Sequence, residues 1–113
     1  MANNVKLKYV SEELVDNQRI RKTQELVLVS GKVQIGTVGF IVTKISANHI
    51  SLEIDEEKSP KARFILTKQI LGKTITVPMK SMNLSLGNWL DFSDGETNKK
   101  HTMYLSGINY IRG

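Results

Sequence analysis

The 113-residue sequence contains no cysteine, which excludes disulfides, thiolate metal ligands and cysteine nucleophiles. Long apolar runs are also missing, and none approaches the roughly 18 residues that a membrane-spanning helix needs. The segment Met1–Asn4 lacks the charged-then-apolar pattern of a signal peptide. From these absences we expect a cytoplasmic protein without a membrane partner.

Motifs for catalysis and metal binding are scarce as well. His49 and His101 are the only histidines, and neither has a second ligand at the spacing that a zinc site uses. We interpret His49 as an exposed turn residue and His101 as part of a basic loop. The segment Gly72–Thr74 matches the end of a P-loop, but Thr67 stands where the loop needs its first glycine. No Gly-x-Ser-x-Gly elbow occurs. We therefore expect no enzyme, no metal and no cofactor.

Alternating apolar and polar residues dominate the region from Leu26 to Ile54. This period of two is typical of strands with one buried face. The turn residues Ser46–His49 separate two such runs, and Asn48 tolerates a left-handed backbone there. The pattern predicts a β-meander whose core positions are Val38, Phe40, Val42, Ile50, Leu52 and Ile54.

Two segments favour helices. Ser11 is a good N-cap for a helix over Glu12–Lys22, with acidic residues at its start and basic residues at its end. Ser59–Pro60 likewise begins a second helical pattern that ends near Gly72. A strand through Phe64–Leu66 is the competing interpretation, because that run is also β-compatible.

The rest of the chain again favours strands. Pro78 places the strand Ile75–Met79 at the edge of a sheet or ends it. Asp94-Gly95 is a hairpin signal. It joins the predicted strands Trp89–Phe92 and Thr102–Leu105, and Met82–Leu86 and Gly107–Ile111 are two further predicted strands. We therefore predict one small domain over residues 1–113: a mainly β fold, a β-barrel of about seven strands with one or two short helices.

Positive charge is concentrated in the second half of the chain. The net charge is +5, and residues 61–113 carry eight lysines and arginines against three acidic residues. Such an excess attracts phosphates. Trp89 and Tyr104 are expected to face each other across a hairpin, either as core packing or as a platform for base stacking. The predicted nucleic-acid-binding residues are Lys61, Arg63, Lys68, Lys73, Lys99, Lys100, Trp89 and Tyr104.

Three stretches resemble the PilZ family, β-barrel modules that bind cyclic di-GMP. They are Phe40–Leu52, Leu71–Val77 and Gly107–Tyr110. The resemblance implies a barrel and a nucleotide site near Ser46, which matches the family motif. Lys44 stands where the family has aspartate, and His49 where it has glycine. PUA-like RNA-binding barrels are similar in the order of their elements alone.

Together these features predict a non-catalytic binding or regulatory module that binds RNA, or another phosphate-bearing ligand, through a basic surface. Two alternatives stay open: a PilZ-like module that senses cyclic di-GMP, and a protein-interaction module. Assembly into a homo-oligomer is compatible with each of them. An enzyme is the least favoured class, because the sequence offers no catalytic constellation.

Overall fold

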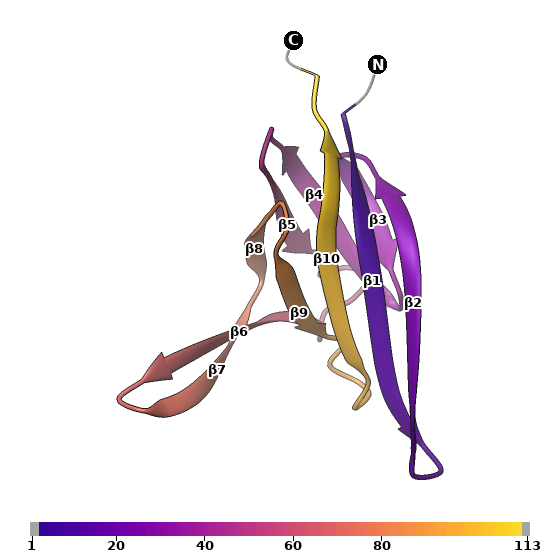
Figure 1. The fold of residues 1–113 in the computed structure, drawn as a ribbon, viewed down its shortest axis with the longest axis vertical. Helices are drawn as coiled ribbons and strands as arrows, with labels where there is room; N and C mark the ends of the chain where they lie inside the picture. Colours follow the sequence, from indigo (N-terminus) through magenta and orange to yellow (C-terminus); the bar gives the residue numbers. More distant parts are fainter. Residues whose placement is uncertain (1–2, 112–113) are drawn as a thin grey trace.

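A computed structural model describes residues 3–111, which form ten strands in two antiparallel sheets and no helix (Figure 1). The larger sheet has the order β2-β1-β10-β9-β6-β7. Its strands are β1 (Asn4–Val15), β2 (Gln18–Leu28), β6 (Arg63–Ile70), β7 (Lys73–Met79), β9 (Trp89–Ser93) and β10 (Lys100–Asn109). The smaller sheet has the order β3-β4-β5-β8. Its strands are β3 (Gly31–Ile35), β4 (Val38–Ile45), β5 (His49–Ile54) and β8 (Ser81–Ser85).

The fold is mainly β, as predicted, but neither sheet closes into a barrel. Each sheet ends in two edge strands: β2 and β7 in the larger sheet, β3 and β8 in the smaller one. The prediction of a β-barrel of about seven strands is therefore wrong, because the two sheets stay open and the described residues form ten strands. The two open sheets bury their apolar faces against each other instead.

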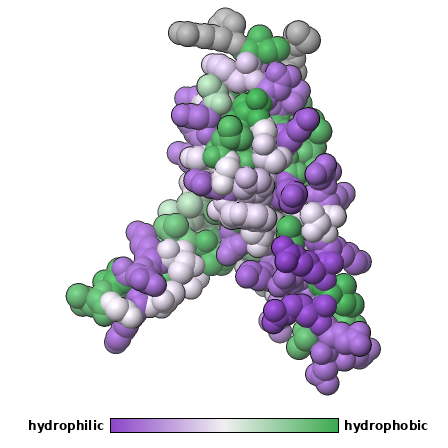
Figure 2. Space-filling model, in the orientation of Figure 1, coloured by the Kyte–Doolittle hydropathy of each residue, from purple (hydrophilic) through white to green (hydrophobic). Residues whose placement is uncertain are grey.

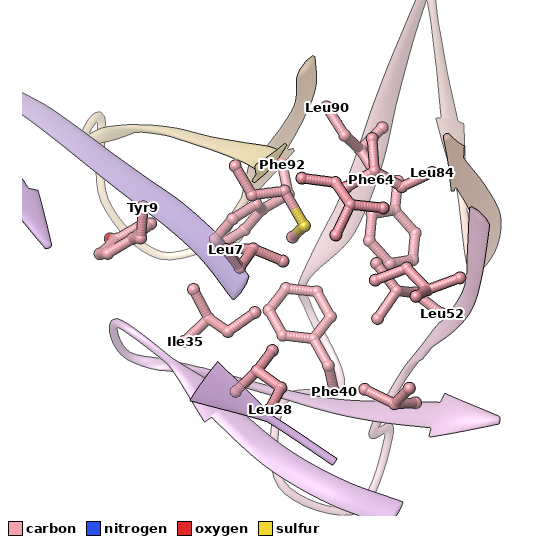
Figure 3. Close-up of a cluster of buried hydrophobic side chains, with 14 of the residues drawn as sticks. Leu7, Tyr9, Leu28, Ile35, Phe40, Leu52, Phe64, Leu84, Leu90 and Phe92 are labelled. Carbon is pink, nitrogen blue, oxygen red and sulfur yellow. The ribbon is translucent and has the colours of Figure 1, made fainter. Parts of the chain in front are cut away.

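The core lies between the sheets and is built around three phenylalanines. Phe40 of β4 is fully buried and packs against Phe64 of β6, with ring centroids 5.4 Å apart. Phe40 also meets Phe92 of β9 edge to face at 4.9 Å (Figure 3). Since Phe40 comes from one sheet and its two partners from the other, this cluster joins the sheets.

The helix expected over Glu12–Lys22 is absent, and the segment is a β-hairpin. Strands β1 and β2 pair continuously from Val5–Leu28 to Val15–Gln18. The turn between them, Asp16-Asn17, has φ angles of 51° and 63°. Aspartate and asparagine tolerate this left-handed conformation, which a two-residue hairpin turn requires. The turn chemistry and the long-range pairing together outweigh the helix-capping signals.

The second expected helix, over Ser59–Gly72, is absent too. The competing interpretation, a strand through Phe64–Leu66, is confirmed: this run lies in β6, which pairs with β7 and β9. Gly72 does not cap a helix. With Leu71 it forms the β6–β7 turn, where both residues have positive φ angles of 76° and 52°.

Several local predictions are confirmed. β4 and β5 form the expected meander around the Ser46–Asn48 turn. Asp94 and Gly95 lie in the loop of the β9–β10 hairpin. Pro78 lies in β7, an edge strand of the larger sheet, where the absence of a backbone N–H is tolerated.

Two hairpin arms project from the same end of the sandwich, opposite to the chain termini (Figure 1). We call Glu12–Arg21 the β1–β2 arm and Thr67–Thr76 the β6–β7 arm. Most of their residues are exposed, in contrast to the buried parts of the same strands nearer the core. The arms therefore extend beyond the shared hydrophobic core.

Candidate nucleic-acid interface

The face of the larger sheet that points away from the core, which we call the outer face, brings aromatic and basic residues together. Side chains alternate between the two faces of a strand. Leu7, Tyr9 and Met103 are buried on the core side, so their neighbours Lys8 and Tyr104 lie on the outer face. The register then defines rows of side chains across the sheet.

The first row contains the aromatic pair. Lys8 of β1 is paired with Tyr104 of β10, which is paired in turn with Trp89 of β9. The Trp89 and Tyr104 rings lie 4.6 Å apart at an interplanar angle of 34°. Trp89 is 54% exposed. The two rings pack against each other outside the core, which leaves aromatic surface open to solvent.

The next two rows supply polar and charged groups. Thr102 of β10 donates a 2.8 Å hydrogen bond to Oδ1 of Asp91 on β9. Glu12 of β1 lies between Arg21 of β2 and Lys100 of β10. The Arg21–Glu12 ion pair is long, at 3.9 Å. A shallow hollow of about 390 Å³ connects these rows; its lining is Val10, Glu12, Arg21, Trp89, Asp91, Lys100 and Thr102.

Of the eight residues predicted to bind nucleic acid, the structure places four on the outer face: Lys100, Trp89, Tyr104 and Arg63. Arg63 lies at the start of β6, where its guanidinium donates to the carbonyl oxygens of Pro60 and Ala62 at 3.0 and 2.6 Å. It also lies 3.8 Å from Glu56. These interactions engage the Arg63 charge within the protein.

The other predicted cations lie elsewhere. Lys61 is in the loop before β6, where its backbone lies close to Gly95. Lys68 and Lys73 belong to the β6–β7 arm, and Lys99 to the β9–β10 loop. These lysines therefore lie on separate elements and do not gather beside Lys100, Trp89 and Tyr104.

Lys8 and Arg21 belong to the outer face but were missed by sequence reasoning. Lys8 lies in the alternating segment Val5–Tyr9, and a period of two places it on the face opposite to Tyr9. Arg21 was assigned to a helix end, so its position across from Glu12 on a neighbouring strand was hidden. Only the register between β1 and β2 reveals it.

A second polar constellation is buried inside the sandwich. His101 is fully buried, so the prediction that it belongs to a basic loop is wrong. Its Nδ1 lies 2.6 Å from the Tyr9 hydroxyl, and its Nε2 lies 3.0 Å from Oδ2 of Asp94. A carboxylate only accepts hydrogen bonds, so for neutral His101 the Nε2–H donates to Asp94 and Nδ1 accepts from Tyr9.

The pKa values of Tyr9 and Asp94 are both shifted. Desolvation raises the pKa of the Tyr9 hydroxyl, and the nearby Asp94 charge adds to the rise. Desolvation alone would also raise the pKa of Asp94. Hydrogen bonds from the Thr97 side chain and backbone, from the Glu96 N–H and from His101 outweigh it and hold that pKa well below its usual range. The buried His101 ring bonds to Tyr9 of β1 on one side and to Asp94 of the β9–β10 loop on the other. The network therefore holds this loop to β1.

Ser46, the residue that matches the PilZ motif, begins the tight turn between β4 and β5, where its N–H donates to the His49 carbonyl at 2.9 Å. No helix of residues 3–111 has the length and apolar character that would cross a membrane. Comparison with protein families, with characterised proteins and with solved structures gives no match.

Proposed function

We propose that this protein is a non-catalytic module that binds single-stranded RNA on the outer face of its larger sheet. The supporting observation is the half-exposed Trp89, packed against Tyr104 and followed across the sheet by Lys8. An aromatic surface beside positive charge is the combination that single-stranded RNA recognition uses.

The aromatic pair supplies a stacking platform. Every base has a flat π-face, so stacking on Trp89 tolerates many sequences, and each stacked base is worth about 1–3 kcal/mol. An open sheet also accommodates an extended strand, because its side chains project in parallel rows. Trp89 and Tyr104 therefore account for base contacts without a deep pocket.

The phosphates of the bound RNA would contact the cationic side chains that surround Trp89 and Tyr104 on the outer face. The outer face carries more positive than negative side chains: its cations are Lys6, Lys8, Arg19, Arg21, Arg63 and Lys100, of which Arg63 pairs with Glu56, and its carboxylates are Glu12, Glu25 and Asp91. Asp91 already accepts a hydrogen bond from Thr102. The long contact to Glu12 leaves most donors of Arg21 available to a phosphate.

The test uses Trp89 as a built-in probe, since it is the only tryptophan of the chain. Titration with an oligouridine of about eight nucleotides, a typical site size for single-strand binding, should quench the Trp89 emission at low salt. Labelled RNA followed by anisotropy should give a binding constant that falls log-linearly with salt. The proposal would be rejected if RNA did not bind at low salt, or if the binding constant did not change with salt concentration.

A matched pair of variants distinguishes RNA binding by the outer face from non-specific attraction to the net positive charge of the protein. Lys100→Gln should weaken RNA binding and lower the salt slope by about one. Lys32→Gln, on β3 in the smaller sheet, removes the same charge far from the aromatic pair and should leave binding nearly unchanged. Calorimetric titration with cyclic di-GMP tests the PilZ resemblance separately. Binding heat with cyclic di-GMP, together with no binding of RNA, would favour nucleotide sensing.

A further inference from the structure

The β6–β7 arm has two chemically different faces. Cross-strand pairing places Leu66 opposite Val77 and Lys68 opposite Ile75 on the face that continues from buried Phe64. The opposite face is polar and carries Thr67, Gln69, Thr74 and Thr76. In residues 3–111 no segment covers the apolar face toward the tip, where Ile70 is 51% and Ile75 39% exposed.

The turn at the end of this arm contains an unexpected residue. Leu71 is 97% exposed and has a φ of 52°, a left-handed conformation that is unfavourable for a bulky side chain. The equivalent turn of the β1–β2 arm uses Asp16-Asn17, residues that suit this geometry. Neither packing nor turn chemistry within the chain explains a leucine at position 71. It is explained if Leu71 contacts something outside the protein.

The charge around this tip has one sign. Residues 63–80 contain three lysines and one arginine, and no acidic residue. Arg63 and Lys80 pair with Glu56 at the base of the arm. Among the described residues, Lys68 and Lys73 form no ion pair. They lie on the apolar face, diagonally across from each other and beside Ile70 and Ile75.

We infer that the β6–β7 arm docks on an anionic phospholipid bilayer, with Leu71 and Ile70 inserted among the lipids and Lys68 and Lys73 at the phosphates. Lysine is depleted in protein–protein interfaces. On a bilayer its stem lies along apolar surface while its ammonium group reaches the headgroups. A nucleic acid would match the lysines but would leave the exposed Ile70, Leu71 and Ile75 without apolar partners.

The placement of the arm fits this role. Figure 2 shows an apolar group of side chains at the end of the arm on the left, the end formed by the β6–β7 turn. The arm projects away from the sandwich, so its tip can enter a lipid surface without displacing the core. The outer face with Trp89 is continuous with the polar, threonine-rich side of the arm and stays free when the opposite side contacts lipid.

The experiment is vesicle co-sedimentation with phosphatidylcholine alone and with phosphatidylcholine containing phosphatidylserine. The protein should sediment with the anionic vesicles and much less with the neutral ones. Leu71→Asn, which suits the turn, should lower the partition coefficient about tenfold or more. Replacing Lys68 or Lys73 by Gln should each lower it about fivefold on anionic vesicles only. Unchanged sedimentation of Leu71→Asn would overturn the inference.

Leu14 of the other arm provides a matched control. It is 71% exposed near the tip of the β1–β2 arm, which carries Glu12, Glu13 and Asp16 against Arg19 and Arg21, with Arg19 directly opposite Leu14. This arm has no excess of positive charge to hold it at an anionic surface, so Leu14→Asn should keep full vesicle binding. An equal loss for Leu14→Asn and Leu71→Asn would refute the assignment to the β6–β7 arm.

A dye gives an independent readout, because the chain has no cysteine of its own. Leu71→Cys, labelled with an environment-sensitive fluorophore, should shift to the blue and brighten on anionic vesicles, whereas labelled Leu14→Cys should not. Light scattering tests the alternative that the tip binds a second copy of the protein. Self-association of the native chain that Leu71→Asn abolishes, without any blue shift on vesicles, would show that the tip binds a second copy and not lipid.

Discussion

Tyr9 and His101 lie 92 positions apart in the sequence, yet their side chains share a 2.6 Å hydrogen bond in the interior. Asp94 extends the contact from the other side of the imidazole. The three residues come from β1, from β10 and from the loop before it, so the network ties the β9–β10 loop to the N-terminal strand. Its stability consequences can be measured directly.

Lowering the pH should reduce the free energy of unfolding, because it protonates Asp94. Its folded pKa is lower than its unfolded one, so the carboxylate contributes stability that is fully present above about pH 4 and is lost as the pH falls toward the folded value. Asp94→Asn should cost about 1–3 kcal/mol at pH 7 and flatten this acid dependence. Urea unfolding at several pH values measures both, and the exposed turn variant Asp16→Asn should change stability by less than about 0.5 kcal/mol.

Raising the pH should also reduce the free energy of unfolding, because it deprotonates the Tyr9 hydroxyl. Its folded pKa is raised above the unfolded value of about 10, so the stability from its protonated hydroxyl is complete below pH 10 and is lost as the pH rises further. Tyr9→Phe leaves Nδ1 of His101 without its donor and should cost about 1–3 kcal/mol near neutral pH. Thermal unfolding followed by circular dichroism checks this; a variant as stable as the native chain would contradict it.

The turn of the β6–β7 arm should become more stable when Leu71 is replaced. Leu71→Asn places a residue that tolerates positive φ into a left-handed position and removes an exposed apolar side chain. We expect the free energy of unfolding to rise by up to about 1 kcal/mol, visible as a higher denaturation midpoint at an unchanged m-value. A lower midpoint would mean that Leu71 contributes contacts within the fold.

The phenylalanine cluster should carry much of the stability between the sheets. Phe40→Ala removes a fully buried ring that contacts both Phe64 and Phe92, and should cost about 3–5 kcal/mol. Chemical denaturation gives the value. Leu86→Ala, at a half-exposed position after β8, serves as the comparison and should cost far less.

RNA binding should depend on the aromatic platform more than on any single charge. Trp89→Ala should weaken binding of labelled oligouridine by about 1–3 kcal/mol while the salt slope stays constant, because stacking releases no counterions. Lys68→Gln and Lys73→Gln, on the arm, should leave RNA affinity almost intact. A large loss for these arm variants would move the binding surface away from the outer face.

Local sequence signals predicted strands well where one face is buried. The alternation through Phe40 and Leu52 gave the correct meander, because burial of one face imposes a period of two. Pro78 correctly indicated an edge strand. The expected pairing of Trp89 with Tyr104 is likewise confirmed by the β9–β10 register. Each of these features depends on neighbours close in the chain.

The two helix predictions failed for a common reason. Ser11 and Ser59–Pro60 have good capping chemistry, but capping is worth only about 1 kcal/mol. Against it stands pairing with distant strands: β1 with β10, and β6 with β9. Such pairing and the burial of Phe64 outweigh local propensity, and neither is visible in a window of neighbouring residues.

The amino-acid sequence by itself determined the mainly β class, the absence of thiol chemistry and the turns at Ser46–Asn48 and Asp94-Gly95, because these follow from residue type and short-range periodicity. Tertiary structure alone decided which cations meet Trp89, that His101 is buried beside Tyr9, and that Leu71 projects into solvent. Those facts depend on strand register and on how two sheets stack. Both are set by contacts between residues far apart in the chain.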